Sequence, residues 1–457
     1  MEAKAAASET AVRWSQSLCA GEQQYVRQRK QVQLKTLSSL GIICTAGLVP
    51  HITLLGSGGG QRAAVGLVGS LYQMEKEGLL DTLLYLGGVS GSTWSMSSLY
   101  SDPEWSTNLD RAVSRLSGPG VEMELALAWL DERSKEEHFS RTDVWGVLTS
   151  AGIMKQMDLR RFSDEASRNA SNPYPIYCAI EKHCFSNGPI EGTHTLGLAV
   201  HTVTSLLGSR FQGGKLLEQK PEMDMVQLQG VCSQAEQSCS KVLGPFMFRN
   251  KKNKQTIFYL SVDDAWGQKL LCSLVVKQQI LLYLLSDVSR VNKLQYRQLS
   301  LSDCVKCTNC KCEMPLNVNV ILFEGLTLCC WAEHSVPPCL QLKDRFHLFD
   351  AGLLINVAYP SFLGDKRDID LLIAPEYSAG NMFEVLDYAA AVNKPFPEID
   401  EKILEERDWP KDCYVFEGKD KEPTIVYMPL FNRNNCKGLL QQKQKYSEHL
   451  TNIAITH

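Results

Sequence analysis

The sequence lacks any long uninterrupted apolar run. The stretch that comes nearest, 270–285, is divided by Lys277, Gln278 and Gln279, whereas a membrane-spanning helix needs about 20 consecutive apolar residues. The first residues are small and polar, without the apolar core of a signal peptide. We therefore expect a cytoplasmic protein with neither a signal peptide nor a transmembrane helix.

A basic excess is also missing. The 457 residues include 47 Lys and Arg and 51 Asp and Glu, a formal net charge of −4. Proteins that bind nucleic acid usually carry an excess of positive charge, so no nucleic-acid partner is expected. With 44% hydrophobic and 21% charged residues, the chain has the composition of a globular protein rather than a disordered one.

Cysteine is plentiful, but its spacing forms no clean zinc motif. The chain has 16 cysteines, which in a cytoplasmic protein are expected to be reduced thiols rather than disulfides. Cys304 and Cys307 have the Cys-x-x-Cys spacing of a zinc site, but the next pair, Cys310 and Cys312, is Cys-x-Cys. Two interpretations remain, a zinc site and unpaired thiols in a poorly ordered insert, and the second is favoured.

The stretch Leu83–Trp94 has the pattern of a nucleophile elbow. An apolar run suited to a buried strand leads through two glycines to Ser90 and Gly91, and a run that can start a helix follows. In such a sharp strand-to-helix turn the serine is held clear of the backbone, and the helix N-terminus favours negative charge. The position two after the serine, usually glycine, is Ser92, so a polar turn before a helix is the alternative.

A glycine-rich loop at 56–60 follows an earlier predicted strand and precedes a predicted helix. Consecutive glycines such as Gly59 and Gly60 let backbone N–H groups converge on one point, as in an oxyanion hole. The lysine of a phosphate loop and the last glycine of a dinucleotide fingerprint are missing. Nucleotide binding is therefore the weaker functional interpretation, and a turn without ligand is the other alternative.

Two features of the predicted helix after this loop need an explanation. Arg62 is interpreted either as an anion-binding residue or as a surface arginine in the first turn. Gly66 and Gly69 each cost a helix about 1 kcal/mol relative to alanine, and close packing against a sheet would explain them. The order strand, glycine loop, helix, strand, elbow, helix suits a parallel α/β sheet.

Ser90 needs a base, and the sequence offers no obvious histidine. In the hydrolase order serine, acid, histidine, only His449 and His457 follow Asp350, and both lie in a polar tail. Asp350 ends a predicted strand beside a small turn, where burial can raise the pKa of its carboxyl enough for it to act as a base. An ordinary Asx turn is the alternative.

Together these motifs resemble the cytosolic, group IV phospholipases A2, most closely their calcium-independent gamma form. The resemblance is carried by Gly-Val-Ser-Gly-Ser at 88–92 and Asp-Ala-Gly at 350–352; patatins are similar but favour Gly-x-Ser-x-Gly and Asp-Gly-Gly. It implies a patatin-like α/β fold with a central, mostly parallel sheet flanked by helices. The implied organisation is an N-terminal helical segment (1–40), a catalytic domain (41–435) with an atypical Cys-rich insert at about 267–338, and a polar tail (436–457).

The resemblance also implies roles for single residues. It makes Ser90 the nucleophile and Asp350 its base, Gly59 and Gly60 the oxyanion-hole donors, and Arg62 and Arg367 phosphate-binding residues, although Arg367 by itself reads as a solvated loop arginine. The implied reaction is hydrolysis of fatty-acyl esters of glycerophospholipids and lysophospholipids through an acyl-enzyme. A catalytically impaired lipid-binding homologue is the alternative.

Two further features of the sequence bear on cofactors and on location in the cell. About 50 residues precede the first predicted strand, too few for a C2 domain of roughly 100–150 residues, so neither calcium nor any other cofactor is expected. No cysteine stands four residues from the end, so no prenylation box is predicted. We expect a cytoplasmic protein that associates peripherally with membranes.

Overall fold

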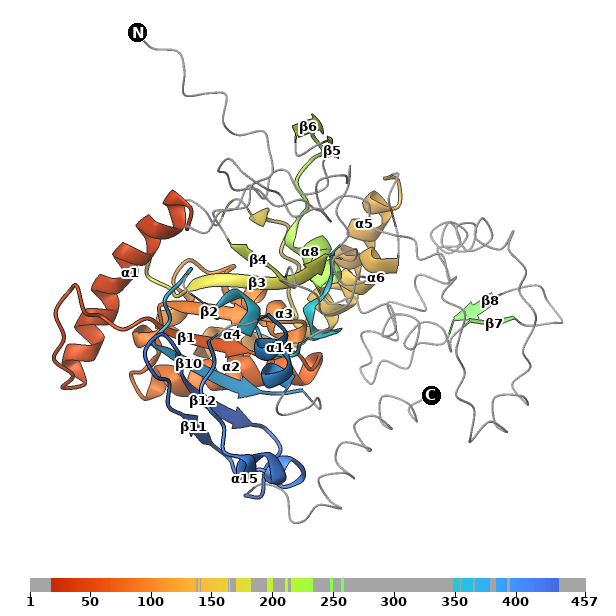
Figure 1. Cartoon of the computed structure of the whole chain (residues 1–457). Coiled ribbons are helices and arrows are strands. Elements are labelled where there is room, and N and C mark those ends of the chain that lie inside the picture. Colours follow the sequence, from red (N-terminus) through yellow and green to blue (C-terminus); the bar gives the residue numbers. More distant parts are fainter. Residues whose placement is uncertain are drawn as a thin grey trace, which may run out of the picture.

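The structure is a computed structural model that describes residues 18–181, 195–199, 210–232, 247–249, 256–258 and 348–434, with short gaps inside these ranges. The Cys-rich insert, the cysteines at 304–312, His449, His457 and the polar tail lie outside the described residues. Figure 1 shows strands lying side by side at the centre, with helix α1 (Ala20–Ser39) beyond one end of them.

An eight-stranded sheet forms the centre of the fold. Its strands are β1 (Ile52–Gly56), β2 (Tyr85–Gly88), β3 (Tyr174–Glu181), β4 (Thr195–Ala199), β9 (Leu348–Asp350), β10 (Leu371–Glu376), β11 (Tyr414–Phe416) and β12 (Thr424–Pro429). The order is β11-β12-β10-β1-β2-β3-β4, with β9 paired to β3. The pairs β12–β10, β10–β1, β1–β2 and β2–β3 are parallel, and those of β11, β4 and β9 are antiparallel. The expected α/β fold with a mostly parallel sheet is confirmed.

Helices pack on this sheet, and small hairpins lie outside it. Besides α1, the helices are α2 (Gln61–Lys76), α3 (Gly91–Leu99), α4 (Asp110–Leu116), α5 (Met123–Arg133), α6 (Arg141–Val147) with a π-helical turn (Leu148–Ile153), α8 (Met225–Cys232), α14 (Glu384–Val392) and α15 (Glu401–Leu404). The hairpins are β5 (Arg210–Gln212) with β6 (Lys215–Glu218), and β7 (Met247–Arg249) with β8 (Thr256–Phe258).

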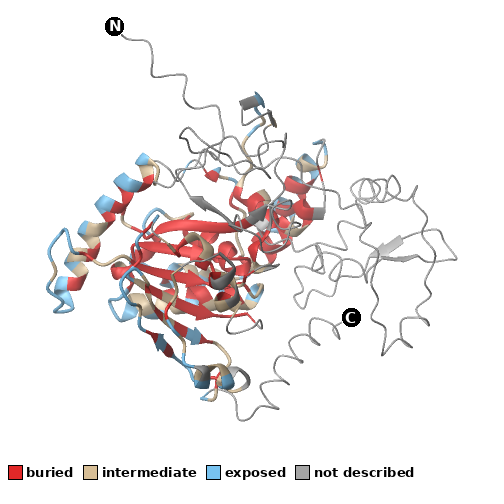
Figure 2. Cartoon of the chain, viewed as in Figure 1, coloured by how far each residue is buried: buried red, intermediate tan, exposed pale blue. Residues whose placement is uncertain are grey.

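The main core is formed by the sheet together with α2 and the other helices and turns packed against the strands. Every residue of β1 and β2 is buried, as expected for strands covered on both faces. Figure 2 shows buried residues concentrated in the central strands and in the helices against them. Gly66 is explained by this packing, because a Cβ there would lie 2.7 Å from the Tyr377 ring. Gly69 is not, because its Cβ would meet nothing within 4 Å.

Helix α1 is fixed to the amino-terminal ends of the strands by buried polar contacts. The Arg29 guanidinium is buried, donates to the carbonyl of Leu83 at 3.0 Å and pairs with Asp81 at 2.9 Å. Tyr25 donates to the carbonyl of Asn172 at 2.9 Å. Arg29 is therefore part of the packing between α1 and the sheet. Within the described ranges, none of the helices is long and apolar enough to cross a bilayer.

Candidate active site

Ser90 occupies a strained turn between β2 and α3. Its backbone has φ 52° and ψ −122°, a region that residues other than glycine rarely adopt. The turn is held from both sides, because Val89 N donates to Gly56 O at 3.2 Å and Thr93 N donates to Ser90 O at 2.8 Å. Ser90 is 8% exposed at the N-terminus of α3. This is the geometry of the nucleophile elbow that the sequence indicates.

The glycine loop lies directly against this elbow. A Cβ added to Gly91 would lie 1.9 Å from the carbonyl oxygen of Gly60, and one added to Gly58 would lie 3.4 Å from Ser90 Cβ. Gly59 and Gly60 have φ angles of +137° and +60°, which glycine adopts without strain. Because Gly60 immediately precedes α2 and Ser90 precedes α3, two helix N-termini meet here, and both favour a negative charge.

Ser92 explains why this elbow departs from the usual glycine. Its hydroxyl donates to the carbonyl of Ser57 at 2.6 Å, which ties α3 to the glycine loop. Gly56 makes room for this hydroxyl, since a Cβ at Gly56 would lie 2.7 Å from Ser92 Oγ. The serine at position 92 is thus part of the contact between the two turns.

Gly91→Ala should disrupt this contact between loop and elbow. The new methyl would overlap the backbone carbonyl of Gly60, which cannot rotate away as a side chain can. We expect a loss of about 3 kcal/mol or more in the free energy of unfolding, at the upper end of overpacking effects. Urea unfolding checks this, with Gly69→Ala as the matched control. The control should stabilise the protein by about 0.5–1 kcal/mol, because alanine favours the helix more than glycine does and its methyl would meet no neighbouring atom. Equal stabilities of the two variants would contradict the tight contact.

The pairing of strands brings Asp350 close to Ser90. Strands β2 and β9 pair with the same edge of β3, one after the other along its length. Residues 174–177 of β3 pair with β2, and residues 179–181 pair with β9. The other edge of β3 is occupied by β4. Since β2 runs parallel and β9 antiparallel to β3, their carboxyl ends point toward one another. Ser90 follows the end of β2, and Asp350 is the last residue of β9.

The two side chains interact. The Ser90 hydroxyl acts on the Asp350 carboxyl and lowers its pKa, and Asp350 Oδ1 accepts from Gly352 N at 2.8 Å. Burial raises the pKa of Asp350 to about 6, and the interactions with Ser90 and Gly352 limit this rise. A carboxylate with such a pKa is ionised at neutral pH and still a better proton acceptor than an exposed aspartate.

His51, the histidine in the part of the chain that the structure describes, lies at the other end of the sheet. Its Nδ1 contacts the carbonyl of Arg367 at 2.8 Å, just ahead of β1. It is therefore no partner for Ser90. The candidate site consists of a serine and an aspartate under a glycine loop.

Arg62 lies in the first turn of α2, beside the glycine loop. Its Nε donates to Tyr377 O at 2.5 Å, and its guanidinium lies 5.4 Å from the centre of the Phe431 ring. The same Tyr377 carbonyl would be 2.8 Å from a Cβ on Gly59, so Arg62 and the loop share a neighbour. An arginine this close to the loop can provide a fixed positive charge.

Arg367 does not lie in this site, contrary to the phosphate-binding role that the family resemblance implied. Its side chain is buried, pairs with Glu22 of α1 at 2.9 Å and donates to Ser361 O at 2.7 Å. Its guanidinium is 5.8 Å from the Tyr85 ring centre, at the beginning of β2. A buried ion pair at the amino-terminal end of the strands satisfies this arginine, so it is neither a solvated loop residue nor a ligand for phosphate beside Ser90.

Two polar residues behind the loop were not found from the sequence. Gly58 N donates to the carbonyl of Asn356 at 2.6 Å, and the Asn356 side chain donates to Glu384 at 3.0 Å. Asn356 follows Asp350 by six positions, but an Asn-x-Ala turn carries no recognisable signal by itself. Within the described residues no group of three or more His, Cys, Asp or Glu side chains could hold a metal ion.

The comparisons with known proteins agree with this geometry. A family model described as the lysophospholipase catalytic domain matches residues 52–114, which include the glycine loop and the elbow. Cytosolic phospholipase A2 zeta of Mus musculus is 30% identical over 474 residues, covering 91% of this chain and 53% of that protein. The gamma form of Mus musculus is 27% identical over 496 residues, covering 91% of this chain and 82% of that protein. The gamma form, which the motifs had indicated, thus matches at lower identity than the zeta form.

A solved structure supports the same fold. Human GIVD cytosolic phospholipase A2 superposes with a TM-score of 0.64 at 22% identity, covering 93% of this chain and 59% of that one. The chain spans about half the length of the zeta relatives that it matches. By these matches the chain is similar to the cytosolic phospholipases A2 and has the fold of human GIVD cytosolic phospholipase A2.

Proposed function

We propose that this chain is a phospholipase A2 and lysophospholipase that uses Ser90 as nucleophile and Asp350 as base. The observation that carries the proposal is the meeting of these two buried side chains, which interact at the facing ends of β2 and β9, on a strained elbow next to a glycine loop. A carboxylate can replace histidine as the base where burial raises its pKa, as it does at Asp350.

The reaction proceeds in two steps through an acyl-enzyme. Ser90 Oγ attacks the ester carbonyl and its proton passes to Asp350, while negative charge develops on the carbonyl oxygen beside the backbone amides of Gly59 and Gly60. Collapse breaks the ester bond, and Asp350 returns its proton to the departing alkoxide of the lysophospholipid or glycerophosphodiester product. Water then attacks the acyl-enzyme, again losing a proton to Asp350, which protonates Ser90 Oγ as the fatty acid leaves.

The reaction can be tested on the whole purified chain. Fatty-acid release from lysophosphatidylcholine micelles and phosphatidylcholine vesicles should be accompanied by covalent modification of Ser90 by a fluorophosphonate, located by mass spectrometry. Activity in the presence of a calcium chelator would support the proposed independence of cofactors. Binding to vesicles without fatty-acid release or labelling would instead support a catalytically impaired lipid-binding homologue.

Arg62 is proposed to bind the phosphate of the substrate. Charged hydrogen bonds contribute about 1.5–3 kcal/mol, so Arg62→Gln should lower kcat/KM for lysophosphatidylcholine by about 10- to 100-fold. An uncharged ester such as p-nitrophenyl butyrate should be hydrolysed within about twofold of the wild-type rate. The exposed Arg111, paired with Asp102, provides the control Arg111→Gln. Equal losses on both substrates would assign Arg62 to the support of the loop rather than to phosphate.

The location of the protein is part of the same proposal. A phospholipase acts at a lipid surface, so peripheral attachment to cytoplasmic membrane faces is expected. Fractionation of cells that express the tagged chain would test this, with the protein divided between cytosol and membranes as the expected result.

A further inference from the structure

Asn356 joins the glycine loop to a carboxylate on α14. Its main-chain carbonyl accepts from Gly58 N at 2.6 Å, while its side-chain Nδ2 donates to Glu384 Oε2 at 3.0 Å and its own N–H donates to Glu384 Oε1. Both carboxylate oxygens of Glu384 therefore act as acceptors for Asn356. The result is a chain of contacts, Glu384 to Asn356 to Gly58, which we call the loop bridge.

The loop bridge ends beside the reacting groups. A Cβ on Gly58 would lie 3.2 Å from Asn356 Oδ1 and 3.4 Å from Ser90 Cβ. A Cβ on Gly352 would lie 3.1 Å from Asp350 Oδ1 and 3.6 Å from Asn356 Oδ1. Asn356 thus lies between the loop and the turn that follows Asp350, and its main-chain carbonyl is bonded to the loop at Gly58.

The bridge needs an ionised Glu384. A carboxylate offers acceptors to both donors of Asn356, whereas a protonated carboxyl presents an O–H toward one of them. Burial, and secondarily the charge of Glu376, raise the pKa of Glu384 to about 7, and its hydrogen bonds with Asn356 and Val357 oppose the rise.

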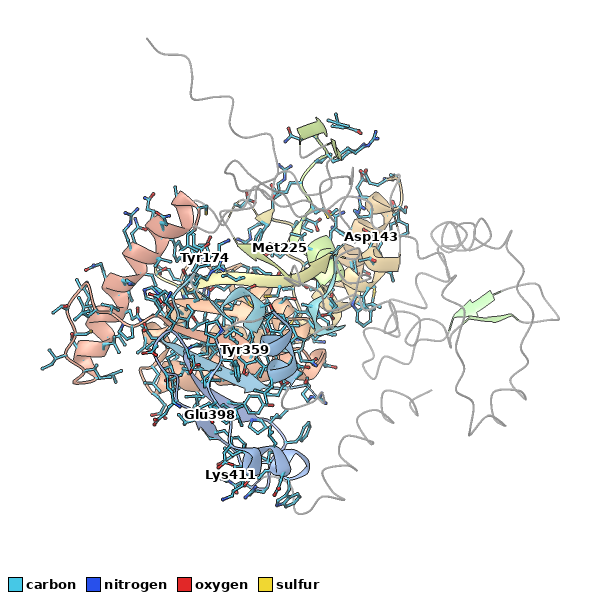
Figure 3. The ribbon with its side chains drawn as sticks, in the orientation of Figure 1. Asp143, Tyr174, Met225, Tyr359, Glu398 and Lys411 are labelled. Carbon is cyan, nitrogen blue, oxygen red and sulfur yellow. The ribbon has the colours of Figure 1, made fainter. Side chains whose placement is uncertain are left out.

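The charged and titratable groups around Glu384 come from neighbouring elements. Glu376, at the end of β10, and Tyr359, labelled in Figure 3, both interact electrostatically with it. Glu376 is itself buried, accepts from Ser378 N at 2.7 Å and interacts electrostatically with Arg62. The Ser57 hydroxyl donates to Gly58 O at 3.0 Å and accepts from Tyr377 N at 2.6 Å, so of these two carboxyls Glu384 is the one that supports the loop, through Asn356.

We propose that Asn356 and Glu384 are positioning residues for the hydrolysis at Ser90, and that the loop bridge holds the glycine loop in its reactive position only while Glu384 is ionised. The inference rests on the proposed function for its kinetic consequence, but its structural part does not. Two carboxyls near Ser90 then act differently. Asp350 accepts the proton, and Glu384 fixes the oxyanion loop from behind.

Glu384→Gln removes the charge and turns an N–H toward the donors of Asn356. At pH 8 the variant should hydrolyse p-nitrophenyl butyrate with a kcat about 10- to 100-fold lower and a KM within about twofold, because misplacement by about 1 Å costs up to about 100-fold. Labelling of Ser90 by a fluorophosphonate should slow by a similar factor. Glu398→Gln is the matched control, since Glu398 (Figure 3) is an exposed partner of Lys419.

The pH dependence separates a positioning role from a merely structural one. In the wild-type protein the rate of labelling should fall as pH drops through about 7, where Glu384 is protonated, and again through about 6, where Asp350 is protonated. Glu384→Gln should lose the first fall and keep the second. The reciprocal double variant Asn356→Asp with Glu384→Gln restores one carboxylate and one amide across the contact, and should recover part of the lost rate.

An activity-independent measurement distinguishes failure of the bridge from failure of the enzyme. Hydrogen–deuterium exchange of the segment 54–62 should be faster in Glu384→Gln and in Asn356→Ala than in the wild-type chain, because the Asn356 main-chain carbonyl that accepts from Gly58 N–H is then held less firmly by residue 384. Asn356→Ala also serves if Glu384→Gln does not fold. A wild-type chain in which Ser90 neither reacts nor turns over ester would refute the proposed function alone. Labelling, pH profile and exchange all unchanged in Glu384→Gln would refute the bridge.

Discussion

Replacing Ser90 with alanine is expected to lower fatty-acid release from lysophosphatidylcholine by at least about a thousandfold. The hydroxyl forms the acyl-enzyme, so its removal leaves only substrate binding and the oxyanion loop. These two contributions retain a small fraction of the rate enhancement. The fold should persist, because alanine keeps the Cβ and meets the same backbone strain at φ 52° that serine already tolerates. Loss of fluorophosphonate labelling and an unchanged melting temperature are the two measurements.

A surface serine gives the control for this variant. Ser117, whose hydroxyl bonds Val113 O after α4 in an exposed position, can be changed to alanine without touching the site. Ser117→Ala should keep its full rate and its labelling. Wild-type turnover by Ser90→Ala would show that another group attacks the ester, and the whole assignment of the site would be wrong.

Changing Asp350 to asparagine should have an equally large effect on the rate. The amide keeps the shape of the side chain and can accept from Gly352 N, but it cannot take the proton of Ser90. We expect a fall in kcat of about a thousandfold or more, comparable to the loss of a catalytic base in other serine hydrolases. In the wild-type enzyme the rate should fall as pH drops below about 6, where the Asp350 carboxylate becomes protonated.

The same substitution should make the protein more stable at neutral pH. Burial raises the pKa of Asp350 from 3.8 to about 6, so the ionised side chain is less favourable in the folded than in the unfolded state, by on the order of 3 kcal/mol. This penalty is fully present above about pH 6 and disappears as pH falls toward 3.8, because the folded state then gains the proton. Asp350→Asn removes it, so its advantage in urea unfolding should be clear at pH 7.5 and small at pH 4.5.

A lower stability of Asp350→Asn at pH 7.5 would contradict this account of the carboxyl. It would mean that the charge is compensated by contacts with donors, and that Asp350 is a fixed structural acceptor rather than a strained base. Asp143, a buried carboxylate paired with Arg133 at 3.0 Å, provides the contrast. Asp143→Asn should destabilise, because it leaves the arginine without its partner charge.

Local sequence predicts the parts of the site that short segments build by themselves. The elbow at Ser90 and the loop at Gly59 and Gly60 each follow a buried strand, and the glycines are required by backbone geometry within a few residues. The pairing of β9 with β3, by contrast, joins segments far apart in the chain. No periodicity encodes that pairing, so the contact between Ser90 and Asp350 could be expected only from the family resemblance.

Arg367 shows where reasoning by motif fails. A basic residue before a buried strand fits a phosphate-binding role, but the amino-terminal end of the sheet and Glu22 of α1 decide its partner. Asn356 and Glu384 were missed for the converse reason. Their contact joins the turn after β9 to α14, and neither residue has a pattern that separates it from ordinary surface residues. Side chains fixed by tertiary contacts are visible only in the fold.

The division of the site between β2 and β9 has a consequence for surveys of genomes. Ser90 and Asp350 are encoded by separate halves of the reading frame. They come together only because β2 and β9 both pair with β3. A related transcript that stopped after the first half would still score well against the serine motif yet specify a protein with no proton acceptor. Classifiers of such genes should therefore require the downstream Asp-Ala-Gly segment before they assign hydrolase activity.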